Sequence, residues 1–169
     1  MKKRNIVLIG FMAAGKTTIS KVLSEKLNMD IVATDDVIVA RENLSINDIF
    51  KNKGEKYFRS LERDIVREYS KKDNVIFDCG GGIILNPDNI KDLKKNGVMI
   101  YLKASPELIL GRVKLDDTRP LMQVKEPLAR INELLKEREP LYSSADFTVL
   151  VDNKTFETVA DEIIKVIKK

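Results

Sequence analysis

The clearest chemical signal in the sequence is a glycine-rich segment near its start. Residues 10–17 match the pattern GxxxxGK[ST], which is typical of loops that wrap around phosphate groups. The glycines let the chain turn tightly, so that backbone N–H groups point at phosphate oxygens. In this pattern Lys16 reaches the β- and γ-phosphates of a nucleotide, and the hydroxyl of Thr17 ligates Mg²⁺. The segment therefore predicts a site for a nucleoside triphosphate and its metal.

Carboxylates suited to chemistry beside a phosphate follow two later apolar segments. Asp35 and Asp36 come at the end of residues 30–34. We expect Asp35 to act as a general base or to orient a substrate hydroxyl, the alternative being that one of the two caps a helix. Asp78 ends another apolar run, the position of a carboxylate that binds Mg²⁺ directly or through water. The glycines at 80–82 then allow a ligand to approach the backbone closely.

Four arginines stand where they can meet an anionic ligand. Arg59 lies next to the apolar face of a predicted helix, and Arg138 lies near the end of another. Arg119 lies in a segment with few apolar residues, and Arg112 is placed to lie against an adenine base. For each of them an ordinary surface salt bridge is the alternative interpretation.

The composition limits the remaining chemistry. The 169 residues include no histidine and one cysteine, Cys79, which excludes Ser-His-Asp and Cys-His nucleophiles, HExxH zinc sites and an internal disulfide. We interpret Cys79 as a packed small residue, and its isolation favours a reducing, cytoplasmic location. Basic residues exceed acidic ones, 30 to 26, but the two are interleaved and only 6% of residues are aromatic. We therefore expect no nucleic-acid-binding surface.

The first residues resemble a secretion signal, because a basic start precedes an apolar stretch. Cleavage there would remove the start of the phosphate-binding motif, so we interpret residues 6–9 as a buried strand instead. No apolar run reaches the roughly 18 residues that a membrane span requires. We expect no association with a membrane.

Strands and helices alternate along the chain. Runs typical of strands occupy residues 6–9, 30–34, 75–77, 98–102 and 147–151, and segments with helical spacing separate them. This alternation predicts an α/β fold, a five-stranded parallel sheet flanked by helices, in a single domain over residues 1–169. Ligands bind outside the carboxyl ends of such strands, where the glycine-rich segment and Asp35 are expected to meet.

Two connections are longer than the sheet requires. Residues 35–72 contain two or three predicted helices, which we interpret as a helical insertion that binds the substrate. Residues 114–127 show no clear periodicity, and we interpret them as a short lid that closes over the nucleotide and carries Arg119.

Taken together, these motifs resemble those of the shikimate kinase family in order and in spacing. The resemblance rests on residues 10–18, 34–35, 54–59, 80–82, 118–121 and 138–142. It implies a P-loop kinase fold and transfer of the ATP γ-phosphoryl group to the 3-hydroxyl of shikimate, with Mg²⁺, on the route to chorismate and the aromatic amino acids. It also implies ATP and shikimate as ligands, with no nucleic-acid or membrane partner, and we expect a monomer.

The resemblance assigns roles position by position. It places ATP against Ala13, Ala14, Gly15, Lys16, Thr17, Thr18, Arg112 and Arg119. It places shikimate against Asp35, Arg59, Gly80, Gly81, Gly82 and Arg138, with the two arginines on its carboxylate. Lys16, Asp35 and Arg119 are the expected catalytic residues, and we expect Thr17 and Asp78 to serve the metal.

Three positions depart from the family's pattern. Ala13 stands where the family usually has glycine, and Phe156 stands where it often has proline near adenine. Ala33 replaces an aspartate that normally helps to hold the waters of Mg²⁺. We predict that Asp78 takes over this task, because it ends a strand expected to flank the P-loop. The alternative is that Asp78 only accepts hydrogen bonds from the glycine loop.

Two other functions compete with this interpretation. One is another small-molecule kinase of similar architecture, for gluconate or a nucleoside monophosphate, although the arginine and glycine pattern favours a small carboxylate as acceptor. The other is a GTPase switch, because residues 78–81 match DxxG. The guanine-reading motif NKxD begins at Asn153, but Phe156 stands in place of its aspartate, which argues against guanine recognition.

Overall fold

A five-stranded parallel sheet forms the centre of the molecule. The computed structural model describes residues 5–114 and 124–168. Within them the strands are β1 (Asn5–Ile9), β2 (Asp30–Ala33), β3 (Val75–Asp78), β4 (Gly97–Lys103) and β5 (Phe147–Leu150), in the spatial order β2-β3-β1-β4-β5. Every neighbouring pair is parallel. The predicted fold class is confirmed.

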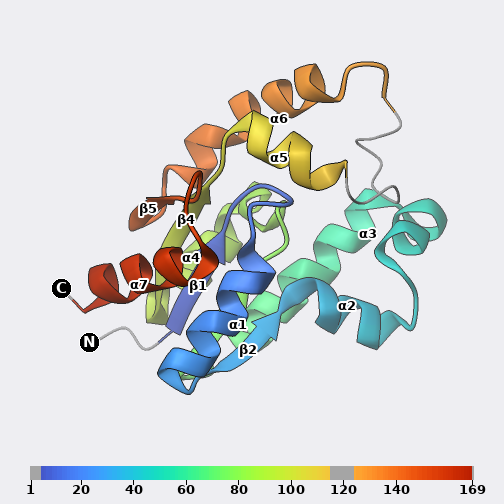
Figure 1. The fold of residues 1–169 in the computed structure, drawn as a ribbon. Helices are drawn as coiled ribbons and strands as arrows, with labels where there is room; N and C mark the ends of the chain where they lie inside the picture. Colours follow the sequence, from blue (N-terminus) through green and yellow to red (C-terminus); the bar gives the residue numbers. More distant parts are fainter. Residues whose placement is uncertain (1–4, 115–123, 169) are drawn as a thin grey trace.

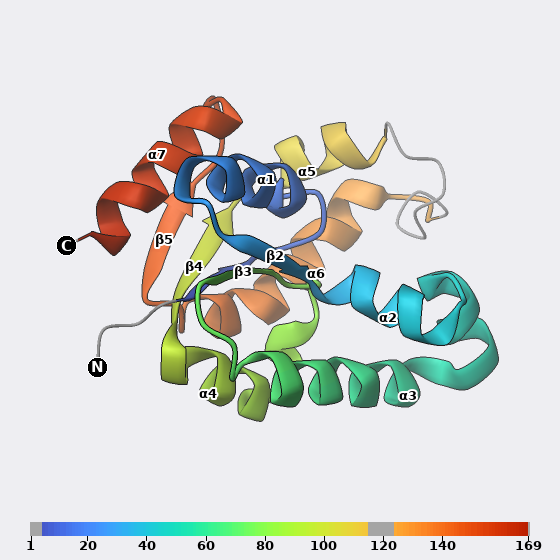
Figure 2. The ribbon, with the colours of Figure 1, turned by 90° about the horizontal axis from the view of Figure 1, so that it is seen from below.

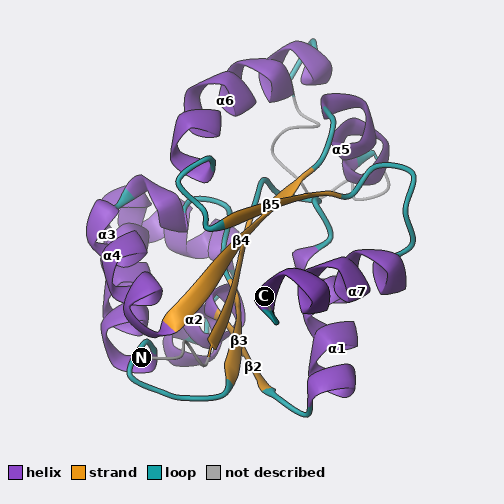
Figure 3. Cartoon of the chain, turned by 90° about the vertical axis from the view of Figure 1, so that its left-hand side faces the viewer, coloured by secondary structure: helices purple, strands orange, loops and turns teal. Residues whose placement is uncertain are grey.

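Helices cover both faces of the sheet. They are α1 (Lys16–Leu27), α2 (Thr34–Glu42), α3 (Ile46–Tyr69), α4 (Pro87–Asn96), α5 (Pro106–Val113), α6 (Pro127–Tyr142) and α7 (Phe156–Ile167), with a short 3₁₀ turn, η1 (Ile83–Leu85). Helices α1 and α7 lie on one face, and α3 and α4 lie on the other (Figures 1 and 3). Because both faces are covered, all five residues of β1 are buried, as expected for a central parallel strand.

The segment between β2 and β3 forms a pair of helices that projects beyond one end of the sheet. It consists of α2 and α3, which extend together to one side of the sheet (Figure 2). Apolar residues of the two helices form their own buried cluster, built on Ile38, Ile49, Phe58 and Ile65. Helix α3 is kinked at Gly54, whose φ of 83° favours glycine. Two or three helices were predicted here, and the structure has two, of which α3 is divided by its kink into a short arm and the part that carries Arg59.

The buried strand predicted at residues 6–9, in place of a secretion signal, is confirmed, because residues 5–9 form the central strand β1. Residues 115–123 of the predicted lid, with Arg119, lie outside the described residues. Helix α6 begins at Pro127, where the predicted lid ends. None of the helices in the described residues is long and apolar enough to cross a membrane.

Candidate active site

A polar cavity lies at the carboxyl ends of β1, β2 and β3. Its volume is about 400 Å³. It is lined by the P-loop, the start of α2, the end of β3 and two residues from the other side of the P-loop: Met12, Ala13, Gly15, Lys16, Thr17, Thr18, Ala33, Asp35, Asp36, Asp78, Cys79, Gly80, Gly81, Arg112 and Phe156. The parallel sheet therefore brings together the segments in which the sequence predicted chemistry.

The P-loop links β1 to α1 and turns sharply twice. Gly15, which precedes α1, has a φ of 99°, a conformation that favours glycine. Ala13 also has a positive φ, 59°, so it adopts the left-handed conformation although it carries a β-carbon. Lys16 is buried, and its Nζ donates to the carbonyls of Gly10 and Phe11 at 3.0 and 2.9 Å. The lysine thus crosses the inside of the loop.

Ala14 differs from the other predicted ATP-binding residues. It is fully buried in the hydrophobic core, and its backbone N–H donates to the Phe11 carbonyl at 3.2 Å. It is not among the residues that line the cavity. Its contribution in this structure is to the shape of the loop.

Asp78 lies directly beside the threonine of the P-loop. The Thr17 hydroxyl donates to Oδ2 of Asp78 at 2.7 Å. Asp78 is also paired with Ala33 across the parallel strands β2 and β3, so the two residues are neighbours at the same edge of the sheet. Burial raises the pKa of Asp78 above its ordinary value, while the hydrogen bond from Thr17 and the charge of Lys16 lower it. The cavity therefore contains a hydroxyl and a carboxylate in contact, close to the phosphate-binding loop.

Asp35 occupies the first turn of α2 and faces the glycine loop. Its Oδ1 atom is buried and has no hydrogen-bond partner in the described structure. A β-carbon added at Gly80 would lie 2.5 Å from this atom, so the close approach depends on glycine. Burial raises the pKa of Asp35, Lys16 opposes the rise, and Asp78 adds to it. A raised pKa makes the carboxylate a stronger base.

The Thr34 hydroxyl fixes the start of the glycine loop that follows β3. This buried residue accepts a hydrogen bond from the Gly80 N–H at 2.9 Å through its hydroxyl. A β-carbon at Gly81 would lie 3.5 Å from the carbonyl of Gly10 and the N–H of Met12, so the glycine loop packs against the P-loop. The two loops therefore form one continuous surface.

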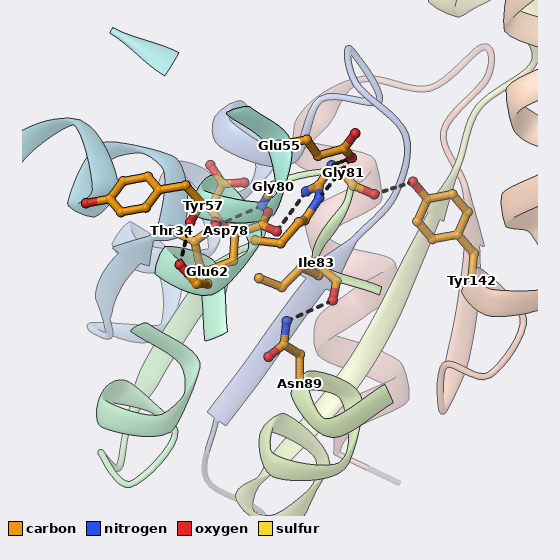
Figure 4. A network of polar contacts seen from close by, with 12 residues as sticks. Thr34, Glu55, Tyr57, Glu62, Asp78, Gly80, Gly81, Ile83, Asn89 and Tyr142 are labelled. Carbon is orange, nitrogen blue, oxygen red and sulfur yellow. Dashed lines mark hydrogen bonds and ion pairs between the residues drawn. The ribbon is translucent and has the colours of Figure 1, made fainter. Parts of the chain in front are cut away.

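Arg59 approaches the same glycine loop from α3. Its guanidinium lies so close to Gly82 that an added β-carbon would be 2.6 Å from its Cζ. Nη1 donates to Glu62 at 2.7 Å, and Nε and Nη2 donate to Glu55 at 3.3 and 3.1 Å, as part of the network in Figure 4. Glu55 is exposed, whereas the side chain of Glu62 is only 2% exposed. The guanidinium is thus fixed by one buried and one exposed carboxylate.

Glu62 is the most unusual acidic residue of the site. Its Oε2 accepts from Arg59, but its Oε1 is buried without a hydrogen-bond partner in the described structure. Burial raises its pKa to about 7, while Arg59 and Arg138 lower it and Asp35 raises it further. Oε1 lies 3.3 Å from a β-carbon added at Gly80, the point that Oδ1 of Asp35 also faces. Two buried carboxylate oxygens therefore converge beside the glycine loop.

Arg138 lies near the end of α6. Its Cζ lies 5.6 Å from the centre of the Phe11 ring, in the P-loop. Its positive charge opposes the rise that burial causes in the pKa of Tyr142 and in that of Glu62. Arg59, Gly82 and Arg138 do not line the cavity beside the P-loop. Arg59 lies against Gly82, and Arg138 lies near Tyr142, whose hydroxyl donates to the Gly81 carbonyl.

Arg112 and Phe156 close the cavity on the other side of the P-loop. The Arg112 guanidinium donates from Nη1 to the Ala13 carbonyl at 2.9 Å and lies over the Phe156 ring at 5.3 Å. The ring contacts the P-loop so closely that a β-carbon at Gly15 would be 2.9 Å from its Cε1. A flat cation and an aromatic ring, both suited to stacking on a nucleotide base, thus stand together.

Comparison with known proteins decides between the kinases that share this architecture. The profile of the shikimate kinase family matches residues 12–168. The chain belongs to the shikimate kinase family. The shikimate kinase of Caldanaerobacter subterraneus subsp. tengcongensis is 46% identical over 162 residues, 96% of this chain and 95% of that protein. The enzyme of Thermoanaerobacter pseudethanolicus is 44% identical over the same share of both chains.

A solved structure of the family agrees in fold as well as in sequence. Shikimate kinase from Acinetobacter baumannii, determined in complex with shikimate, superimposes with a TM-score of 0.92 and 34% identity over 98% of this chain and 93% of that one. Membership of this family excludes the GTPase interpretation and sets aside the gluconate and nucleotide acceptors. The predicted family is therefore confirmed.

Most of the predicted site residues lie in or beside the P-loop and the glycine loop, while Arg119 lies outside the described residues. Asp36 is not the helix cap that we considered, because Ala33 precedes α2 and Asp35 and Asp36 lie in its first turn. Cys79 is fully buried, and burial raises the pKa of its thiol well above the ordinary value, consistent with a packed residue. Glu62 was missed, although its spacing of three residues from Arg59 on a helix was an available signal.

Proposed function

We propose that this chain transfers the γ-phosphoryl group of ATP to the 3-hydroxyl of shikimate. The observation that carries the proposal is the position of Asp35. Its buried, unpartnered oxygen faces the glycine loop, and its charged neighbours include the P-loop lysine and Arg59 of α3. A hydroxyl that donates to this oxygen would stand between the phosphate-binding loop and Arg59, within reach of a γ-phosphate held by the loop.

The nucleotide occupies the cavity beside the P-loop. Backbone N–H groups of the loop and the start of α1 face the phosphates, and Lys16 leaves its carbonyl contacts to meet the β- and γ-phosphates. Arg112 and Phe156 offer their flat faces to the adenine base. Arg119, which lies outside the described residues, is the proposed source of a further positive charge on the phosphates.

The acceptor lies against the glycine loop. Arg59 and Arg138 pair with its carboxylate, since guanidinium groups match carboxylates in geometry and charge. Gly81 offers its backbone to a ring hydroxyl, with Gly80 and Gly82 on either side. Asp35 accepts a hydrogen bond from the 3-hydroxyl, orients it and takes its proton as the oxygen attacks phosphorus. The raised pKa of Asp35 assists that last step.

Mg²⁺ is part of the proposal, and the residues beside the P-loop suit it. The described residues contain no cluster of three or more acidic, cysteine or histidine ligands. Mg²⁺ in kinases needs no such cluster, because phosphates and waters supply most of its ligands. Thr17 and Asp78 provide the hydroxyl and the carboxylate that would hold it and its waters. Bound there, it would neutralise charge on the transferred group.

Asp78 is the proposed replacement for the aspartate that the family usually has at position 33. The pairing of Ala33 with Asp78 across β2 and β3 supports the exchange, since it moves a carboxylate by one strand along the same sheet edge. We expect Asp78→Asn to weaken the Mg²⁺ dependence of ADP binding, measured by titration calorimetry. Adding Ala33→Asp to that variant restores part of the dependence. An unchanged Mg²⁺ requirement in Asp78→Asn refutes the exchange.

The proposal extends to the pathway, the location and the oligomeric state of the enzyme. Its product leads toward chorismate and the aromatic amino acids, and we propose a cytoplasmic monomer that works without nucleic-acid or membrane partners. Size-exclusion chromatography with light scattering tests the monomer. A stable dimer at micromolar concentration contradicts it.

The reaction itself is tested by ADP release with a panel of acceptors. Shikimate, quinate, gluconate, AMP and CMP are each supplied with ATP and Mg²⁺, and a sample without acceptor measures ATP hydrolysis. We expect shikimate to give the highest kcat/KM by a wide margin. ADP release that ignores shikimate and responds to gluconate or AMP refutes the proposal.

A further inference from the structure

Tyr142 joins the two sides of the proposed acceptor site. It is the last residue of α6 and is fully buried. Its ring stacks on Tyr101 of β4, with ring centres 4.9 Å apart and an angle of 12° between the ring planes. A buried tyrosine ring is stabilised by such packing, but its hydroxyl requires polar partners because an unpaired polar group is costly away from water.

The Tyr142 hydroxyl has neighbours in two different parts of the chain. It donates to the Gly81 carbonyl at 2.8 Å, a bond visible at the right of Figure 4. Burial raises the pKa of Tyr142 to about 12, so the hydroxyl keeps the proton that it donates to Gly81. The positive charge of Arg138, on the same helix, opposes this rise in the pKa of Tyr142, so the guanidinium lies near the hydroxyl. The hydroxyl therefore links the end of α6, beside Arg138, to the glycine loop.

The end of α6 depends on this bridge more than an ordinary helix end does. Pro140 lies between Arg138 and Tyr142 and has no N–H, so the last turn lacks one backbone hydrogen bond. The i, i+4 spacing places Arg138 and Tyr142 on the same side of the helix. The hydrogen bond of the Tyr142 hydroxyl therefore restrains the position of this helix end, and of Arg138 on it, where a backbone hydrogen bond is missing.

We propose that Tyr142 is a positioning residue that sets the distance between the Gly81 backbone and the Arg138 guanidinium, and thereby the affinity for the acceptor. The inference rests on the proposed function, in which these two groups contact shikimate. Tyr142 does not touch the acceptor in this arrangement. Its loss should weaken the recognition of shikimate and leave the phosphate-binding loop unaffected.

Tyr101 offers a matched control for the experiment. It belongs to the same stacked pair and is also buried, but its hydroxyl donates to Glu139 instead, at 2.7 Å. Tyr142→Phe and Tyr101→Phe each remove one buried hydroxyl and keep the ring. We expect Tyr142→Phe to raise the KM and the Kd for shikimate by about tenfold, the upper end of what the loss of one buried hydrogen bond costs, with kcat and the KM for ATP changed less than twofold. Tyr101→Phe should change all four less than twofold.

A double variant tests whether Tyr142 acts through Arg138. In an Arg138→Ala background, Tyr142→Phe should cost less shikimate affinity than it does in the wild type, because part of what the hydroxyl positions is already absent. Titration calorimetry gives the Kd values, and thermal unfolding shows whether the two tyrosine variants lose similar stability.

Four results overturn the inference. Equal effects of the two tyrosine variants on shikimate affinity would indicate general loosening of the core. An undiminished effect in the Arg138→Ala background would show that Tyr142 does not act through the arginine. If Arg138→Ala weakens shikimate binding and Tyr142→Phe does not, the inference on Tyr142 alone fails. If Arg138→Ala has no effect, the proposed role of Arg138 is wrong and the inference fails with it.

Discussion

Glu62 should make the stability of the protein depend on pH in a direction opposite to that of most carboxylates. Burial raises its pKa from 4.5 to about 7 in the folded protein. A group with a raised folded pKa binds a proton more tightly when folded, so its contribution is complete below pH 4.5 and is lost as the pH rises through 7. Each unit of pKa difference corresponds to about 1.4 kcal/mol, so the loss is about 3 kcal/mol.

The variant that removes this dependence is Glu62→Gln. Its side chain keeps the shape and an oxygen acceptor for Arg59 but does not titrate. We expect the free energy of unfolding of the wild type, from urea titrations between pH 5 and 8, to fall relative to that of the variant by about 2–3 kcal/mol as the pH rises. The two proteins are compared by how their free energies of unfolding change with pH, not by the absolute values. The variant also weakens the hydrogen bond to Arg59, and this lowers its stability by the same amount at every pH.

The charges that face Glu62 define the control and the refuting result. Arg59 of α3, Asp35 of α2 and Arg138 of α6 are its charged neighbours. Glu55→Gln removes an exposed carboxylate from the same guanidinium and controls for the loss of an ion pair with Arg59. Parallel stability curves for the wild type and Glu62→Gln refute the reasoning, because they show that folding does not change the proton affinity of Glu62.

Three further predictions concern the acceptor and the reacting group. Gly82→Ala should raise the KM for shikimate at least about tenfold, because the added β-carbon lies 2.6 Å from Cζ of Arg59 and displaces the guanidinium. An unchanged KM for shikimate in steady-state assays contradicts this. Asp35→Asn should lower kcat by about 10²–10⁴ because an amide is not a base, and an effect limited to the KM for ATP argues against it. Glu55→Gln should lower the KM for shikimate about two- to threefold, because the exposed Glu55 carboxylate competes with the shikimate carboxylate for Nε and Nη2 of Arg59. A raised KM for shikimate shows instead that Glu55 only orients the arginine.

The fold was predictable because its signals are local. The continuous apolar run at residues 5–9 and the glycines of the P-loop require only neighbouring residues to be recognised, and β1 and the start of α1 lie where they were expected. The second strand was predicted over residues 30–34 but ends at Ala33, since Thr34 already belongs to α2. Its hydroxyl is used by the glycine loop, a contact made 46 residues along the chain.

Other features of the site were hidden because they depend on packing between distant segments. Glu62 is an ordinary helical glutamate in the sequence and becomes a buried carboxylate only when α3 meets α2 and the glycine loop. Tyr142 was noticed within a motif, but its link to Gly81 joins residues 61 positions apart. No periodicity or local spacing encodes contacts of this kind.

Analysis of the product tests the central claim most directly. Shikimate, ATP and Mg²⁺ are incubated with the enzyme, and the product is examined by two-dimensional ³¹P–¹H NMR. We predict a single phosphate ester, with phosphorus coupled to the proton on carbon 3 of the ring, formed at least about 10²-fold more slowly by Asp35→Asn. A phosphate on another hydroxyl, or release of inorganic phosphate with no ester, would contradict the placement of Asp35 at the reacting hydroxyl.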